Sequence, residues 1–223
     1  MKNSSQQRKH ETSIGIVEVA ARLFGQIGFQ KTTVSDIARE LHMSPANVYR
    51  FFSAKAEINE AVAHRLLAEI EVAVANIAKD GGPASQQLRA SIAAIEKQNA
   101  RRFLENRKLH ELVETAFNEN WPIVHEHVQK LNDALAAIIA HGNDEGEFHV
   151  EDCELAAILV RSACIRFCHP RLMVECAQDP EPTIDQMIDF CLVALAQGLT
   201  ALKLDARDSA FPQGPERNIA AAS

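Results

Sequence analysis

The chain has no apolar run long enough to cross a membrane and no apolar signal region at its start. A membrane-spanning helix needs about 20 consecutive apolar residues, and residues 1–10 are polar, so we expect neither membrane insertion nor secretion. The five cysteines are an odd number and do not resemble a disulfide framework. The sequence therefore predicts a cytoplasmic protein with reduced thiols.

The motifs of common enzymes are also missing. The sequence has no Ser/His/Asp spacing for nucleophilic catalysis, no phosphate-binding loop and no cluster of metal ligands. No segment alternates apolar and polar residues for long enough to be a strand. We therefore expect an all-α protein that is not an enzyme and that needs neither a cofactor nor a metal ion.

Charge is distributed unevenly along the chain. The net charge of −7 argues against a nucleic-acid partner, but residues 1–55 hold eight basic and four acidic side chains, a balance of +4. The remaining residues hold 15 basic and 26 acidic side chains, a balance of −11. Screening limits phosphate attraction to about 8–10 Å. A basic head that binds nucleic acid is therefore compatible with an acidic body.

Apolar residues recur at helical spacing in ten segments. We expect helices over roughly 11–27, 33–41, 44–52, 53–78, 84–99, 102–118, 122–142, 152–168, 171–177 and 183–203. Gly28 is expected to end the first helix in a left-handed conformation, and Ser53 is expected to cap the fourth. These patterns predict a helical head over 1–54, a larger helical body over 55–204, and a disordered tail over 205–223.

Residues 32–52 carry the pattern of a helix-turn-helix. Thr33 and Asp36 have the spacing of a capping box at the start of one short helix. Ser44 can cap the next, with Pro45 at its first position, where the missing N–H costs nothing. The residues expected to face inward and hold the two helices together are Val34, Ile37, Ala38, Leu41, Val48 and Phe52.

The second of these helices offers the chemistry that reads duplex DNA. Asn47 and Arg50 can pair with base edges, and Ala46 can touch a thymine methyl group. Hydroxyl groups and an ammonium group suited to phosphates come from Thr33, Ser44, Tyr49 and Lys55. A helical hairpin whose polar residues are only solvated remains the alternative reading of the pattern alone.

The head resembles a known family over residues 12–62. The resemblance rests on these residues: Ala-Arg-Leu-Phe from Ala21, then Gly28-Phe29, Thr32-Thr33-Val34, Ile37-Ala38, and Ser44 to Phe52 followed by Lys55. In order and spacing it is similar to the N-terminal domain of the TetR/AcrR family of bacterial repressors. The resemblance implies an all-helical homodimer with an N-terminal three-helix DNA-binding domain. It also implies a divergent helical C-terminal domain that dimerises and holds an effector.

Matched by position, the family's DNA contacts fall on eight residues here. Phosphate contacts are implied for Thr33, Tyr49 and Lys55, and contacts at or beside the bases for Ser44, Pro45, Ala46, Asn47 and Arg50. One departure stands at His42, where the family's turn usually has glycine. We expect His42 to adopt a positive φ, which His tolerates better than a β-branched residue does, and its ring is placed to reach a phosphate.

Residues of the body are harder to assign. The resemblance implies dimerisation through 152–168 and 183–203, and the candidate interface residues are Ile165, Met187, Phe190, Cys191, Ala194 and Leu195. A fully buried core helix is the alternative for 183–203. Polar and aromatic side chains among aliphatic ones are the candidates for an effector pocket. They are Phe103, His110, Phe117, Trp121, His125, Cys164, Arg166 and Phe167, and His127 lies near them in the sequence.

Two of these features have competing readings. Arg166 can meet an anionic ligand or pair with a structural acid. Cys164, Cys168 and His169 allow a metal or redox role, but they lack the paired CxxC spacing of strong zinc sites, and buried cysteine also serves as a small hydrophobic residue.

The prediction from sequence is therefore a homodimeric regulator that binds a near-palindromic operator in double-stranded DNA. The preferred form is a repressor released by an unknown small molecule. The alternative is a DNA-binding regulator that a protein partner controls.

Overall fold

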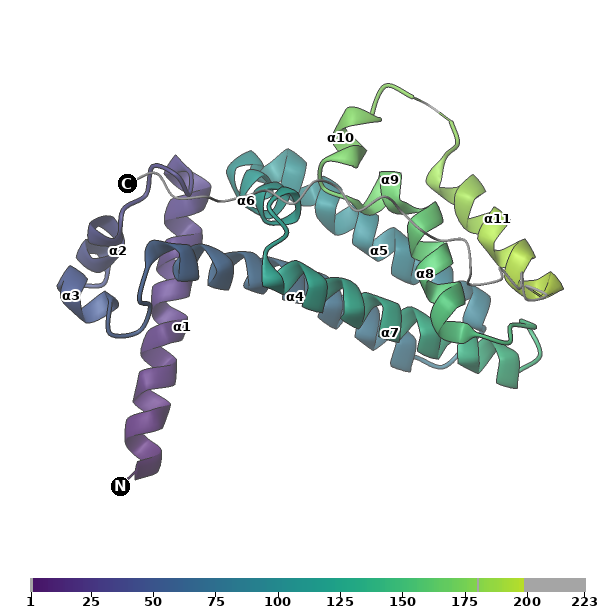
Figure 1. Ribbon diagram of the computed structural model, residues 1–223, viewed down its shortest axis with the longest axis horizontal. Helices are drawn as coiled ribbons and strands as arrows, with labels where there is room; N and C mark the ends of the chain where they lie inside the picture. Colours follow the sequence, from purple (N-terminus) through teal and green to yellow (C-terminus); the bar gives the residue numbers. More distant parts are fainter. Residues whose placement is uncertain (1, 180, 199–223) are drawn as a thin grey trace, which may run out of the picture.

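The computed structural model describes residues 2–179 and 181–198, and every regular element in these residues is a helix. A head of three helices lies at one end of the molecule, and a long helix, α4, runs from it into an elongated body (Figure 1). The expected all-α fold is confirmed. The predicted tail over 205–223, and the last residues of the helix expected to reach 203, lie outside the described residues.

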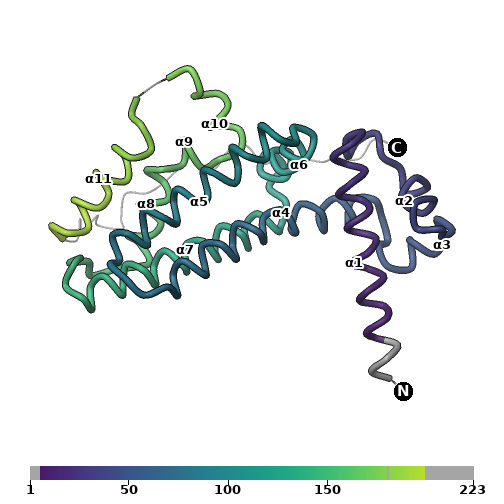
Figure 2. Tube along the Cα trace, turned by 180° about the vertical axis from the view of Figure 1, so that it is seen from behind, coloured from purple at the N-terminus to yellow at the C-terminus, as the bar shows by residue number. Residues whose placement is uncertain are grey.

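The head contains α1 (Lys2–Ile27), α2 (Val34–Glu40) and α3 (Pro45–Val48). α1 begins well before the predicted start at residue 11, so its first turns extend beyond the rest of the head (Figure 2). Gly28 follows with φ 95°, as expected for a left-handed end to a helix.

The body is built on three long helices that lie side by side: α4 (Lys55–Lys79), α5 (Ala84–Glu105) and α7 (Pro122–Asp144). The shorter α6 (Arg107–Asn118) joins α5 to α7 and packs on α1 and α4. The break between α5 and α6 falls at Asn106, later than the sequence predicted, because the Asn106 side chain caps α6 by accepting from the Leu109 N–H at 3.2 Å.

The helix predicted over 152–168 is instead two: α8 (Cys153–Ala163) and the short α9 (Ile165–Cys168), with the break at Cys164. The next segment contains α10 (Leu172–Glu175), and α11 (Ile184–Gln197) is capped by Thr183. α11 packs on α8 and α5, at the side of the body far from the head (Figure 2). No helix of the described residues is long and apolar enough to cross a membrane.

Two buried apolar clusters hold the fold together. One lies within the body and joins α4, α5, α7, α8 and α11. The other begins in the head with residues such as Ile16, Phe24 and Ile37, and continues without a break into Leu112 and Val113 of α6. The head is therefore fixed to the body through α6 as well as through α4.

Candidate nucleic-acid interface and effector cavity

The start of α2 is fixed by the capping box that the sequence predicted. The Thr33 hydroxyl accepts from the Asp36 N–H at 3.1 Å and donates to the Asp36 carboxylate at 2.7 Å. The same carboxylate accepts from the Thr33 N–H at 2.9 Å. These hydrogen bonds lower the pKa of Asp36 below its ordinary value, and the bond from the Thr33 hydroxyl has the largest effect. Thr33 is thus held rigidly at the exposed N-terminus of α2.

The start of α3 also follows the prediction. Ser44 caps it by accepting from the Asn47 N–H at 3.2 Å, and Pro45 occupies the first turn. Val48 is fully buried and packs with the α2 residues Ile37 and Ala38 in the head core. Five of the predicted inward residues are buried, and the sixth, Leu41, is half-buried against the same core.

The turn between the two helices has the predicted backbone strain at His42. Its φ is 53°, in the left-handed region that non-glycine residues occupy at a cost. The N–H of the next residue, Met43, donates to the Ala38 carbonyl oxygen at 2.8 Å. The strained turn is therefore anchored to α2, and the His42 side chain is exposed.

The outer surface formed by α3 and the residues at its two ends carries polar side chains and no acid. Its exposed side chains are Ser44, Pro45, Ala46, Tyr49 and Arg50, and Asn47 is half-buried beside them. No acidic residue occurs between positions 41 and 56. A phosphate backbone approaching this surface therefore meets no like charge from these residues.

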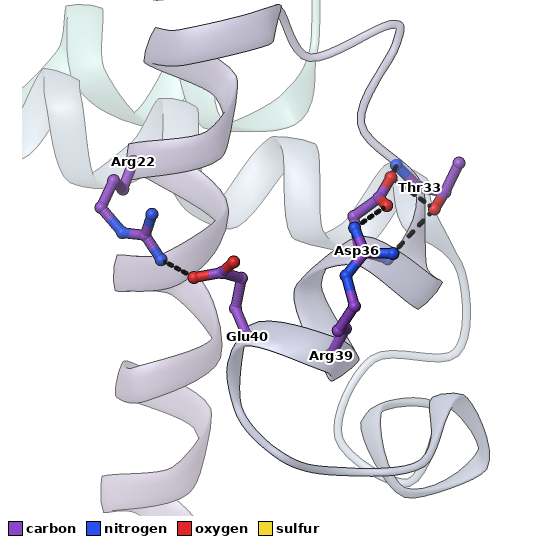
Figure 3. Close-up of polar contacts among 5 residues, drawn as sticks. All are labelled: Arg22, Thr33, Asp36, Arg39 and Glu40. Atoms are coloured by element: carbon purple, nitrogen blue, oxygen red, sulfur yellow. Dashed lines mark hydrogen bonds and ion pairs between the residues drawn. The ribbon is translucent and has the colours of Figure 1, made fainter.

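The acids that flank this surface are already paired within the head. Glu40 accepts from Arg22 of α1 at 2.5 Å, and Asp36 accepts from Arg39 at 2.7 Å (Figure 3). Beyond α3, the Glu57 carboxylate accepts from the Ser53 N–H at 2.7 Å. The predicted capping of α4 by Ser53 is thus wrong, because the N-cap is Ala54 and the side chain of Glu57 binds Ser53 instead.

Lys55 stands at the first position of α4, at the edge of this surface. Its ammonium donates to the Gln30 carbonyl oxygen at 3.0 Å, and burial lowers the pKa of its side chain. The hydrogen bond ties α4 to the loop between α1 and α2. Of the nine residues predicted to contact DNA, eight lie in the head, at the start of α2, in the turn and around α3, and Lys55 lies at the first position of α4.

A cavity of about 50 Å³ lies in the body between α4, α5, α6, α7, α8 and α9. Its apolar lining residues are Leu67, Ile92, Ile95, Phe117, Val128, Leu131 and Ile165. Its polar lining residues are Asn99, His127, Arg161, Cys168 and His169. Mostly apolar walls with a few placed polar groups are typical of a small-molecule site.

Of the eight side chains predicted for an effector pocket, only Phe117 lines this cavity. Trp121 bonds Glu119 at 2.9 Å, Phe103 stacks under Arg107 at 4.5 Å, and His125 is exposed. The predicted pocket residue His110 is buried, and its Nε2 lies 3.0 Å from the Pro170 carbonyl oxygen.

The three remaining predicted pocket residues lie around α9 and have other partners. Arg166 donates to the carbonyl oxygens of Cys176 and Asp179, so it holds the segment before α11, and within the described residues it has no ion pair with an acid. The Arg166 guanidinium lies 5.2 Å from the centre of the Phe167 ring.

Cys164 is fully buried, and its thiol is hydrogen-bonded to the thiol of Cys191 of α11. This hydrogen bond, together with burial, raises the pKa of the Cys164 thiol. Within the part of the chain that the structure describes, no group of three or more residues is arranged to hold a metal ion.

The sequence placed His127 beside the pocket candidates and named Cys168 and His169 for a metal or redox role, but the rest of the polar lining was not predicted. The signal was a polar residue on an otherwise apolar helix face. Asn99 follows Ile92 and Ile95 at helical spacing on α5, and His127 precedes Leu131 on α7 in the same way.

Exposed apolar side chains lie on the outer sides of α8, α9 and α11. They are Leu155, Ile158, Leu159, Ile165, Phe190 and Val193, of which Phe190 is 69% exposed. Among the predicted interface residues, Ile165 and Phe190 belong to this group, and Met187 and Ala194 are half-buried. Cys191 and Leu195 are buried in the core of the body instead.

The head and body together define a two-domain helical regulator with a helix-turn-helix. Residues 16–62 match the family described as bacterial regulatory proteins of the tetR family, and residues 84–187 match the tetracyclin repressor-like C-terminal domain. The chain belongs to the TetR family of transcriptional regulators. Its membership is shown by matches in both of its parts.

Individual relatives agree with this assignment. An uncharacterized HTH-type transcriptional regulator of Bacillus subtilis, YhgD, is 26% identical over 161 residues, which are 70% of this chain and 73% of that protein. A TetR-family regulator of Pectobacterium atrosepticum has a similar fold, with a TM-score of 0.61 at 14% identity over 86% of this chain and 93% of that one.

A further similar structure is that of the regulator RolR in complex with resorcinol. It has a TM-score of 0.58 at 16% identity, over 84% of this chain and 89% of that one. At these identities the two solved structures show likeness of fold alone.

Proposed function

We propose that this protein is a homodimeric repressor whose α3 helices read two half-sites of a near-palindromic operator. The observation that carries the proposal is the acid-free polar surface of α3, with the flanking acids paired to residues of the head. Two such surfaces in a symmetric dimer fit successive major grooves of duplex DNA.

Within this interface, we assign phosphate contacts to Thr33, Tyr49 and Lys55, and base-edge contacts to Asn47 and Arg50. Tyr49 and Arg50 are exposed at the end of α3 and have no ion pair within the described residues. Their side chains are therefore available without breaking an existing contact. Ser44, Pro45, Ala46 and His42 border the same surface.

We further propose that the body cavity binds a small effector that releases the DNA. At about 50 Å³ the cavity is smaller than the roughly 150 Å³ of an engineered cavity that binds benzene, so a ring-sized ligand must push its walls apart. One wall is Leu67 of α4, the helix that begins at Lys55. A displaced α4 would change the spacing of the two heads. Such a ligand favours the released state through its higher affinity for that state.

The cavity supports small-molecule control over control by a protein partner. The fold is similar to that of RolR, a regulator solved with resorcinol, and a compact ligand is compatible with the small cavity of this chain.

The experiment that tests the regulator is a selection of DNA sequences from random duplexes with the purified protein, followed by titration at several salt concentrations. We expect a palindromic site bound more tightly than random DNA, with affinity falling steeply as salt rises. Arg50→Ala should relax the selected sequence at one position of each half-site. The exposed body residue Arg101 supplies the control, and Arg101→Ala should leave the selected sequence unchanged. Failure to select any sequence contradicts the proposal.

A further inference from the structure

One cation lines the body cavity without an acid beside it. Arg161 of α8 donates from Nε to the Asn132 side-chain oxygen at 2.8 Å. In the residues that the structure describes, neither terminal nitrogen of Arg161 has a carboxylate partner, and no acidic residue lines the cavity. A half-buried guanidinium presents its two terminal nitrogens in the geometry that binds a carboxylate through two parallel hydrogen bonds.

The two histidines of the lining present opposite hydrogen-bonding character. His127 Nδ1 lies 2.9 Å from the Glu71 carboxylate, which can only accept, so Nδ1 carries the proton and Nε2 of the neutral ring is an acceptor. The Arg171 N–H donates to His169 Nδ1 at 3.2 Å, so the proton of this neutral ring is on Nε2, which is a donor. Burial lowers the pKa of both imidazoles, which favours these neutral forms.

The acid that bonds the lining residue His127 also has a cationic partner. Glu71 accepts from Lys130 at 2.8 Å in addition to its bond with His127. Burial alone would raise the pKa of Glu71, but the hydrogen bonds from Lys130 and His127 outweigh burial and leave it lowered. The pair therefore adds little net charge to the cavity, and Arg161 remains its one charged lining residue.

We propose that the effector is a compact hydroxylated monocarboxylate with an apolar body. Its carboxylate pairs with the terminal nitrogens of Arg161 and with His169, its hydroxyl donates to Nε2 of His127, and its apolar part packs on the aliphatic walls. Among the described lining residues there is no acid to bind a cationic ligand, and the single arginine matches one negative charge. This inference rests on the proposed effector role of the cavity and names the ligand class that the role requires.

The test is isothermal titration calorimetry of the full-length protein with 3-hydroxybenzoate and 4-hydroxybenzoate. Each probe has two matched analogues: the hydroxybenzamide, which lacks the charge, and benzoate, which lacks the hydroxyl. We expect at least one hydroxybenzoate to bind about 10–100-fold more tightly than its amide, since a charge-assisted pair is lost. We expect it to bind about tenfold more tightly than benzoate. Amides that bind as tightly as the acids, or hydroxybenzoates that do not bind, overturn the proposal.

Two variants locate the contacts. Arg161→Met should abolish the preference for the acid over the amide, and His127→Leu should abolish the preference for the hydroxylated probe over benzoate. Arg101→Met, at an exposed arginine of α5, is the control and should keep both preferences. If Arg161→Met does not fold, Arg161→Lys keeps the charge but loses the fork, and an intermediate preference is expected. An unchanged preference in the Arg161 variant overturns the assignment.

Two measurements on the same protein distinguish a failure of the proposed ligand class from a failure of the proposed repressor function. DNA binding without ligand, measured on the selected duplex, tests the regulator. Sequence-specific DNA binding together with no response to any carboxylate refutes the ligand class only. Hydroxybenzoate binding without DNA binding refutes the repressor and leaves the ligand class standing.

Discussion

Replacement of Phe190 by aspartate should convert the proposed homodimer into monomers. Phe190 is 69% exposed on the outer side of α11, among the apolar residues of α8, α9 and α11. A phenylalanine buries about 200 Å² when it is fully covered, so a partner would cover about 140 Å² at this side chain. At about 25 cal/mol per Å² this burial contributes about 3.5 kcal/mol in each protomer.

The contact counts twice in a symmetric dimer, because each protomer presents the same residue. The upper limit is therefore about 7 kcal/mol, of which roughly half survives the entropy and imperfect fit of association. A loss of about 3.5 kcal/mol weakens the dimer roughly 300-fold. The charge of aspartate in an apolar interface adds to this loss.

Sedimentation velocity over a range of protein concentrations measures the change in the dimer dissociation constant. Val72→Asp is the matched control, because Val72 is 59% exposed but belongs to α4, outside the group of exposed apolar residues on α8, α9 and α11. The control should remain dimeric. A Phe190→Asp variant that dimerises as tightly as the parent would show that this surface is not the subunit interface.

Four further results are expected. Lys55→Gln should weaken operator binding and reduce the slope of log affinity against log salt by about one, measured by fluorescence anisotropy; an unchanged slope rules out its phosphate contact. The pKa of Asp36 is lowered in the folded protein, so its ionised form stabilises the fold at pH values above the ordinary pKa of 3.8, and this stability is lost as the pH falls through the lower folded pKa. Thr33→Ala removes the main cause of the lowered pKa, so the melting temperature, recorded by circular dichroism, should depend less steeply on pH in this acidic range. Gly142→Ala should lower the melting temperature, since its Cβ would lie 2.6 Å from Phe148 Cε2 and cost about 1–3 kcal/mol. Gly15→Ala should raise the melting temperature, because nothing lies within 4 Å of the added Cβ and the higher helix propensity of alanine adds about 1 kcal/mol to the free energy of unfolding.

The head could be read from sequence because its structure is set by local chemistry. The hydrogen bonds of Thr33 with Asp36 and of Ser44 with Asn47 join residues three apart, and the positive φ of His42 follows from the shortness of the turn. Such features depend little on the rest of the chain. The same is true of the inward apolar residues of α2 and α3.

The body could not be read in the same way because its site is formed between distant helices. The cavity brings Asn99, His127 and Arg161 together from three helices, and no pattern within one helix shows which face will meet the others. Arg166 illustrates the difficulty. It stands five residues from Arg161, yet it binds backbone carbonyl oxygens of a later segment rather than lining the cavity.

The buried cluster that runs from α1 into α6 has a consequence for engineering hybrid regulators. Leu112, Val113 and Ala116 of α6 are fully buried against head residues such as Ile16 and Phe24. A chimera that joins residues 1–54 to the body of another regulator would remove this cover and leave the apolar back of the head facing a foreign surface. A transplant of DNA specificity therefore has to carry the matching face of α6 with the head, or else exchange only the exposed side chains of α3.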